Sequence, residues 1–325
     1  MDNKKWFKEA QFGMMVHFGL YSLLGGEWNG ECMSYIGEWA QSYFRIPNKE
    51  YHRLANIFNP IYFDADEWIK LANDAGMKYF VITAKHHEGF ALFKSNVSKF
   101  NVVDATPFGR DIIGELAAAC RKYNMKFGLY YSQSIDWAHP DGNSGTAKQP
   151  MNMCDMPWGN EWDYPDKSKK DYMRCFNDKI KPQVKEILTN YGDLALIWFD
   201  TPLGIPEKCS QELYDMVKKY QPDCLINSRI GNGKCDYTSA EDNMSPDDDK
   251  SDILYESPIT LNDTWGFKPT DQHWKSAQRV VEIKDHLNER GANLLLNVGP
   301  DGLGRIPARS VEILKEVGKI LNERR

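Results

Sequence analysis

Strand-like and helix-like segments alternate along most of this 325-residue chain, and this alternation constrains the fold more than any other feature. Six short apolar segments have the length and composition of buried strands. They cover residues 12–17, 77–83, 125–131, 194–199, 223–228 and 293–298. Helical segments lie between and after them, at residues 65–75, 111–123, 168–190, 210–220, 274–290 and 308–321. Repeated βα units of this kind predict a parallel sheet.

The expected architecture is an α/β fold in which the sheet closes into a (β/α)8-like, TIM-type barrel. Residues 229–270 are irregular and leave room for one or two weak strands, so we expect a distorted barrel. An open doubly wound sheet is the alternative, but the first strand lacks the glycine-rich phosphate loop of that fold. For the long helix, Ser168 is the predicted N-cap and Pro182 a predicted break. No change in composition marks a boundary, so residues 1–325 are expected to form one domain.

Charge and composition exclude several classes of partner. The net charge of −6 gives no basic surface for nucleic acid or an anionic membrane. The first ten residues are polar and lack the apolar core of a signal peptide, and no apolar run reaches the roughly 20 residues of a spanning helix. The seven cysteines have no regular spacing, so the sequence does not predict a metal site built from cysteines. We therefore expect a cytoplasmic protein.

Polar side chains follow four of the predicted strands, at the point where each strand ends. The strands run into His17, His86-His87, Tyr130-Tyr131 and Asp200. The C-terminal ends of barrel strands meet on one face, so these side chains are expected to converge there. A simpler role for Asp200 is to cap a turn or helix. Four polar strand ends in succession nevertheless predict an active site.

Three kinds of site fit these residues. His17, one of His86 and His87, and Asp200 could bind a metal, as in a mononuclear hydrolase, although no His-x-His motif follows the first strand. The same side chains could form a ring of hydrogen bonds around a polyol. A glycosidase would need a second carboxyl group to protonate the leaving oxygen. Candidates for that group are Asp236, Glu241, Asp242 and Glu256.

Nine motifs then occur in order from about Trp6 to Gly304. They are FGMMVHFGLY at 12–21, GEW at 37–39, Asn59-Pro60 with Phe63-Asp64, YFVITAKHHEGF at 79–90, GRD at 109–111, FGLYYS at 127–132, WFD at 198–200, TWG at 264–266 and LLNVGP at 295–300. Together they resemble glycoside hydrolase family 29, the α-L-fucosidases. Within that family the chain is most similar to the short, lactobacillus-type α-1,6-fucosidases.

The resemblance implies a retaining exo-α-L-fucosidase on a (β/α)8-like barrel, without cofactor or metal. Asp200, in the Trp-Phe-Asp motif, would be the nucleophile that forms a covalent fucosyl-enzyme, and water or another sugar would release the fucose. The acid/base would be Asp242, with Glu241 and Glu256 as alternatives. The implied substrates are small fucosylated oligosaccharides, above all α-1,6-fucosyl-GlcNAc, with a capacity for transfucosylation.

The predicted substrate contacts come from the same motifs. They are His17, Glu38, Trp39, His86, His87, Tyr131, Trp198, Arg229 and Trp265, with Trp265 packed near the C5 methyl of fucose. The variable segment 137–166 is expected to set the linkage preference. Few residues follow the closing helix, so we expect a departure from the family plan, without the usual C-terminal β-sandwich, and we expect a homo-oligomer. A metal-dependent hydrolase on the same barrel and an inactive fucose-binding protein are the alternatives.

Overall fold

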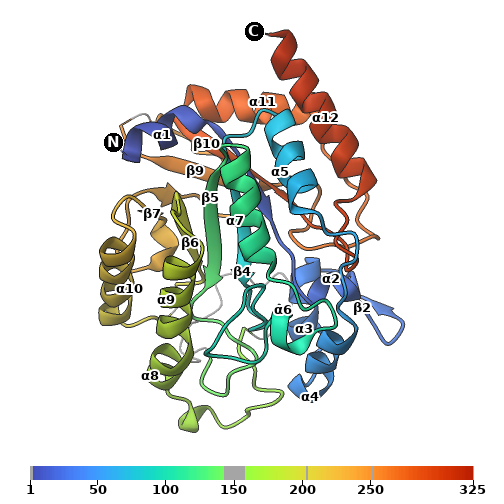
Figure 1. The fold of residues 1–325 in the computed structure, drawn as a ribbon, viewed down its shortest axis with the longest axis vertical. Coiled ribbons are helices and arrows are strands. Elements are labelled where there is room, and N and C mark those ends of the chain that lie inside the picture. The colour runs from blue at the N-terminus through green and yellow to red at the C-terminus, as the bar shows by residue number, and fades with distance from the viewer. Residues whose placement is uncertain (1–2, 143–157, 203, 251, 325) are drawn as a thin grey trace.

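The barrel predicted from the sequence is present in the computed structural model, which describes residues 3–142, 158–202, 204–250 and 252–324 (Figure 1). All its strand pairs are parallel, in the order β7-β6-β5-β4-β1-β10-β9-β8. The bounds are β1 (Phe12–Val16), β4 (Tyr79–Lys85), β5 (Lys126–Ser132), β6 (Leu196–Asp200), β7 (Leu225–Ile226), β8 (Thr238–Ser239), β9 (Tyr255–Thr260) and β10 (Ala292–Val298). The six predicted strands are confirmed, and β8 and β9 lie in the irregular region where weak strands were expected.

The first and last strands of this order meet at a short seam. A parallel bridge joins Asn227 to Tyr237, and the backbone N–H groups of Asp236 and Tyr237 donate to the Ile226 carbonyl at 2.8 and 3.2 Å. Because β7 contains only two residues, the side-chain amide of Asn227 continues its ladder. That amide bonds both backbone groups of Phe199, each at 2.9 Å. The seam thus closes the barrel next to the end of β6.

Seven helices of eight or more residues surround the described strands or cap the barrel (Figure 1). They are α1 (Asn3–Ala10), α5 (Ala65–Asp74), α7 (Ile112–Lys122), α9 (Lys181–Asn190), α10 (Glu207–Tyr220), α11 (Ala277–Glu289) and α12 (Ala308–Glu323). Shorter pieces are α2 (Tyr21–Leu24), α3 (Ala40–Tyr43), α4 (Asn48–Tyr51), α6 (Val102–Ala105), α8 (Tyr172–Cys175) and the hairpin of β2 (Glu27–Trp28) and β3 (Glu31–Cys32). Asp64, Asp111 and Ser276 cap α5, α7 and α11 by accepting backbone N–H groups. None of the described helices is long and apolar enough to cross a membrane.

The long helix predicted at residues 168–190 differs from the prediction at its N-cap and at the expected break. Ser168 lies in a separate 3-10 turn, Lys167–Lys169, and the helix begins with α8, where Asp171 is the N-cap that accepts from Met173 N at 2.9 Å. A π-helical turn, Phe176–Ile180, then leads into α9. Pro182 lies in the first turn of α9, where its missing N–H is tolerated after the wider turn, so the helix changes pitch and does not break.

Side chains alternate between two apolar layers along the strands. The larger layer lies between strands and helices. The smaller fills the barrel interior with Met15, Tyr79, Tyr130 and Trp198, and Phe7 of α1 closes its N-terminal end against Tyr79 and Tyr237. On β6 the inward positions are Leu196, Trp198 and Asp200. The pleat therefore directs Asp200 into the mouth of the barrel.

The seam between β7 and β8 offers a test of the closure. Asp236 Oδ2 accepts from Ile226 N at 2.9 Å and from Lys218 Nζ at 2.6 Å, and Oδ1 accepts from Tyr214 Oη at 3.2 Å. Asp236→Ala should lower the free energy of unfolding by about 1–3 kcal/mol, because it leaves these donors unpaired. Urea denaturation followed by tryptophan fluorescence measures the change. Asp215→Ala, on the exposed face of α10, should stay within about 0.5 kcal/mol; an equal loss in both variants would contradict the role of Asp236.

Candidate active site

A cavity of about 220 Å³ opens at the C-terminal end of the barrel strands. Eleven of the predicted site residues line it: His17, Glu38, Trp39, His86, His87, Trp198, Asp200, Arg229, Glu241, Asp242 and Trp265. Tyr130 also lines it; it was among the polar strand ends noted in the sequence but not among the predicted substrate contacts. The predicted residues therefore converge as expected, except Tyr131 and two of the acid candidates, Asp236 and Glu256.

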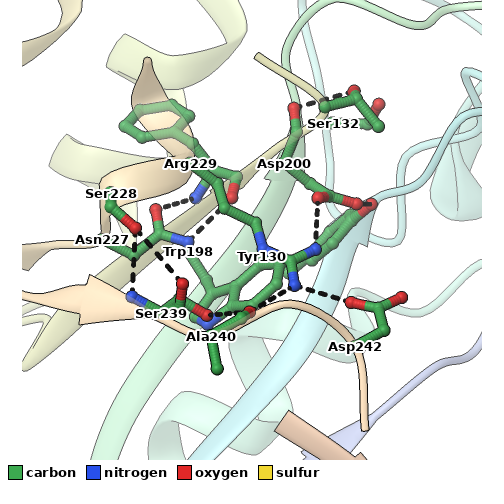
Figure 2. A network of polar contacts seen from close by, with 12 residues as sticks. Tyr130, Ser132, Trp198, Asp200, Asn227, Ser228, Arg229, Ser239, Ala240 and Asp242 are labelled. Atoms are coloured by element: carbon green, nitrogen blue, oxygen red, sulfur yellow. Dashed lines mark hydrogen bonds and ion pairs between the residues drawn. The ribbon is translucent and has the colours of Figure 1, made fainter. Parts of the chain in front are cut away.

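Asp200 is fixed by donors on both of its oxygens (Figure 2). Tyr130 Oη donates to Oδ2 at 2.7 Å, and Arg229 Nη1 donates to Oδ1 at 3.0 Å. His87 Nε2 lies 4.0 Å from Oδ2. The next residue, Thr201, has a φ of 53°, which is strained for a β-branched residue. These contacts hold the carboxylate in one orientation, with 14 % of its side chain exposed to the cavity.

Arg229 lies between two carboxylates, as Figure 2 shows. Besides Asp200, it binds Asp242 through Nη2 at 2.6 Å, and the same nitrogen donates to the Ala240 carbonyl at 2.8 Å. Its guanidinium lies 4.6 Å from the centre of the Trp198 ring, a cation–π contact. Burial alone would lower the pKa of Arg229, but the two carboxylates outweigh it and raise that pKa. The guanidinium thus offsets the repulsion between two acids that face one cavity.

The four candidates for the second carboxyl group occupy different places. Asp236 lies outside the cavity, at the seam between β7 and β8, where it binds Lys218 and Ile226 N. Asp242, with 39 % of its side chain exposed, and Glu241 lie at the rim of the cavity. Glu256 is fully buried on β9, where it accepts from Tyr79 Oη at 2.7 Å and from Trp198 Nε1 at 2.9 Å. Burial raises the pKa of Glu256 to about 7. Because Glu256 binds the edge of Trp198 away from the cavity, the geometry leaves Asp242 and Glu241 as the candidates.

Two of the buried histidines have a defined tautomer. His17 Nδ1 lies 2.7 Å from Asn297 Oδ1, and Asn297 Nδ2 donates to the Trp265 carbonyl at 2.7 Å, so His17 Nδ1 is the donor. His87 Nδ1 lies 2.7 Å from Ser132 Oγ, whose own proton goes to the Ile135 carbonyl at 2.8 Å, so His87 Nδ1 donates too. In both rings Nε2 is left as a hydrogen-bond acceptor.

Burial keeps all three histidines of the cavity neutral. It lowers the pKa of His17 to about 4, and it lowers the pKa values of His86 and His87 well below their usual range. His86 stacks on Tyr130 with ring centres 5.5 Å apart, and its buried Nδ1 has no partner among the described residues. Neutral imidazoles both donate and accept, which suits a ligand rich in hydroxyl groups.

Glu38 adds a polar group whose charge is also suppressed. It is 2 % exposed, and its Oε2 accepts from Gly266 N at 2.8 Å. Burial raises the pKa of Glu38 to about 8, so the carboxyl group is protonated at neutral pH and can donate a hydrogen bond. Trp39 and Trp265 form aromatic walls, with the Trp39 ring 5.1 Å from His87 and the Trp265 ring 5.2 Å from His17.

Tyr131, one of the predicted contacts, lies outside the cavity. Its side chain points to the helix layer, where Oη donates to Gln183 Oε1 of α9 at 2.9 Å. Its neighbour Tyr130 points inward and takes the predicted place. The two tyrosines are adjacent in sequence, so alternation along β5 allows only one of them to face the cavity. The inward tyrosine is recognised only once the register against β6 is known.

A metal centre finds little geometric support in the part of the chain that the structure describes. Among the described residues, three ligand atoms of His, Cys, Asp or Glu lie within 4.8 Å of one another only at Asp263, Asp271 and His273. This group lies outside the cavity, and Asp263 and His273 are exposed. His17, His86, His87 and Asp200 do not bring three such atoms together. Their hydrogen bonds instead direct them around a cavity of small-molecule size.

A (β/α)8 barrel with a sheltered carboxylate, a second acid at the rim, aromatic walls and neutral polar groups defines a glycoside hydrolase site. The comparisons agree: the α-L-fucosidase family model matches residues 1–324. The chain belongs to this family and is an enzyme of the α-L-fucosidase class.

Relatives and solved structures show how close the likeness is. Tissue alpha-L-fucosidase of Rattus norvegicus is 32% identical, with 98% of this chain and 68% of that protein covered. Unliganded alpha-L-fucosidase AlfC from Lactobacillus casei is 51% identical over 99% of both chains, with a TM-score of 0.94. Isoenzyme 1 from Paenibacillus thiaminolyticus is 35% identical, with a TM-score of 0.85 over 98% of this chain and 75% of that one.

The protonated state of Glu38 gives a pH test. Fucose binding should weaken as the pH rises through about 8, because ionisation removes the proton that Glu38 donates. Above that pH the apparent Kd should rise about tenfold per pH unit. Glu38→Gln keeps a neutral donor and should give a flat profile, whereas Glu31→Gln, on the exposed β2–β3 hairpin, should follow wild type. Calorimetric titration with fucose from pH 6 to 9.5 measures this; the same profile in wild type and Glu38→Gln would refute it.

Proposed function

We propose that this protein is a retaining exo-α-L-fucosidase that removes terminal α-linked L-fucose from small fucosylated glycans. The observation that carries the proposal is the pair of carboxylates on one guanidinium, with Asp200 on Nη1 and Asp242 on Nη2 of Arg229. Retaining enzymes need their two carboxyl groups about 5–5.5 Å apart, and inverting enzymes about 6.5–9.5 Å. Two carboxylates bound to neighbouring nitrogens of one guanidinium are held close together, which favours the shorter separation of a retaining enzyme.

In this proposal Asp200 attacks the anomeric carbon of fucose. Tyr130 and Arg229 fix the orientation of the carboxylate, which still lines the cavity. Asp242 protonates the departing oxygen and later takes a proton from the water that releases fucose. Its partial exposure at the rim suits this role, because the leaving group departs and water enters there.

The rest of the cavity suits one small, uncharged sugar ring. The unprotonated nitrogens of His17 and His87 would accept hydrogen bonds from ring hydroxyls, and the protonated Glu38 would donate one. His86, whose buried Nδ1 has no described partner, offers a further polar atom. Trp265 would pack on the apolar edge of fucose near its C5 methyl group, with Trp39 on the neighbouring wall.

The preferred aglycone is proposed by similarity. A variant of AlfC has been solved with Fucα(1,6)GlcNAc and another complex with 4-nitrophenyl-α-L-fucopyranoside, and both structures are 50% identical to this chain. Other AlfC structures are of fucosyltransferase mutants, which supports capture of the fucosyl-enzyme by a sugar acceptor. We therefore extend the proposal to α-1,6-fucosyl-GlcNAc and to transfucosylation. Within the predicted linkage segment, Trp158 lines the cavity, and residues 143–157 lie outside the described part.

The nucleophile is tested with p-nitrophenyl α-L-fucoside. Asp200→Ala should lower kcat by about 10⁴-fold or more, because the variant lacks the carboxylate that forms the covalent intermediate, while fucose binding persists. Wild-type activity should be the same with and without EDTA, whereas a metal-dependent hydrolase would lose it. NMR of the first product should show α-L-fucose, the retained anomer. An initial β anomer, or substantial turnover by the variant, would refute the mechanism.

The acid/base is tested by comparing Asp242→Asn with Glu241→Gln. Loss of the general acid should lower kcat/KM for Fucα(1,6)GlcNAc by about 10²–10⁴-fold, with a much smaller loss for the nitrophenyl fucoside, whose leaving group needs no proton. Added azide should restore turnover of the aryl fucoside by Asp242→Asn, since azide attacks the fucosyl-enzyme without base assistance. If this pattern appears in Glu241→Gln instead, the acid/base is Glu241.

A further inference from the structure

A cluster of three buried charged side chains lies directly behind the His86-His87 segment. Lys85 ends β4, Asp136 lies in the loop after β5, and Lys179 comes from the π-helical turn before α9. Their exposed fractions are 0, 1 and 6 %. Lys85 Nζ and Lys179 Nζ both bind Asp136 Oδ2, at 3.0 and 2.7 Å. None of these residues lines the cavity, and the proposed reaction does not use them.

The charges within this cluster do not cancel. Two cations share one carboxylate, and Asp136 Oδ1 has no hydrogen-bond partner among the described residues. Burial lowers the pKa of Lys85, and Asp136 opposes that shift. A buried charge network of this kind stabilises a fold no better than apolar side chains of similar volume would. Its presence next to the active site therefore calls for a role beyond packing.

The cluster and the residue next to it contact the backbone of the histidine segment through two hydrogen bonds and one close approach. Lys179 Nζ donates to the Gly89 carbonyl at 3.2 Å, and Trp137 N, next to Asp136, donates to the His87 carbonyl at 2.8 Å. Gly89 has a φ of 78°, and a Cβ placed there would lie 2.4 Å from Asp136 Oδ1. Only glycine lets the carboxylate approach the segment this closely. The backbone around His86 and His87 is thus fixed by residues of the cluster.

The cluster also presents a cation to the imidazoles. His87 faces Lys85 from its own strand end, His17 from β1, Asp136 from the loop after β5 and Asp200 from β6. His86 faces His87, His17 and Lys85, and its ring packs against the phenols of Tyr21 and Tyr130. After burial, a neighbouring cation or histidine is what lowers the pKa of each ring, and Lys85 acts on both.

We propose that the Lys85–Asp136–Lys179 cluster is a positioning element of the sugar subsite, which holds His86 and His87 in place and in their neutral form. The two rings can then accept hydrogen bonds from hydroxyl groups across the whole working pH range. The identity of the ligand rests on the function proposed above. The protonation state of the rings does not, so it can be measured independently of fucosidase activity.

The test measures imidazole protonation in full-length protein with ¹⁵N-labelled histidine. Lys85→Met and Lys179→Met each leave one balanced Lys–Asp pair, so both variants keep the buried charge compensated. In Lys85→Met the NMR titrations of His86 and His87 should move up by about one pH unit, because the cation that acts on both rings is gone. Lys179→Met should shift them less, in the same direction. Lys181→Met, on the same helix but paired with Glu212 at the surface, is the matched control and should leave them unchanged.

A kinetic readout separates positioning from simple loss of stability. The acid limb of the kcat/KM profile should move to higher pH in Lys85→Met, since protonated rings cannot accept from the sugar. Folded Lys85→Met and Lys179→Met proteins with the histidine titrations of wild type would overturn the proposal. If Lys85→Met does not fold, the Lys179→Met titration decides by itself. Shifted titrations in a protein without fucosidase activity would support the cluster and contradict only the proposed function.

Discussion

Side-chain alternation along β5 and β6 is the constraint on which the active site depends. The parallel register sets Tyr130 opposite Trp198 and Ser132 opposite Asp200, and the pleat turns Tyr130, Trp198 and Asp200 toward the barrel interior. The phenol of Tyr130 therefore reaches the carboxylate of Asp200 from one strand away. A shift of β6 by one residue against β5 would turn Asp200 into the helix layer, away from Tyr130, so the register of two strands decides whether a nucleophile faces the cavity.

Stacked aromatic rings connect the barrel core to the groups that contact Asp200. The rings of His86 and Tyr130, and of Tyr130 and Trp198, lie 5.5 and 5.6 Å apart with 18° between their planes, and the guanidinium of Arg229 caps the column. Glu256 holds Trp198, one of the stacked rings, in place by accepting its indole N–H. Each group that touches Asp200 is thus supported on its far side. A site built this way needs little rearrangement when charge develops during the reaction.

The fold and most of the site could be predicted from the sequence because their signals are local. Runs such as residues 194–199 are strongly apolar, and the polar residues that follow them fall at one barrel face for topological reasons. Tyr131 and Glu256 were misplaced because their positions depend on register and depth, which one strand alone does not encode. The two-residue strands β7 and β8 carry almost no periodicity. Lys179 turns inward in a π-helical turn that helical spacing does not predict.

Burial is the largest effect on the charge of both kinds of polar group in the sugar subsite. It lowers the pKa of His17, His86 and His87 and raises that of Glu38, so all four are neutral near pH 7. The described groups nearest the reacting bond are Asp200, Asp242 and Arg229, which binds both of these acids. In the proposed reaction the sugar gains positive charge in an oxocarbenium-like transition state. Cationic histidines around that ring would oppose this charge, whereas neutral ones bind the hydroxyls and leave Asp200 to stabilise it.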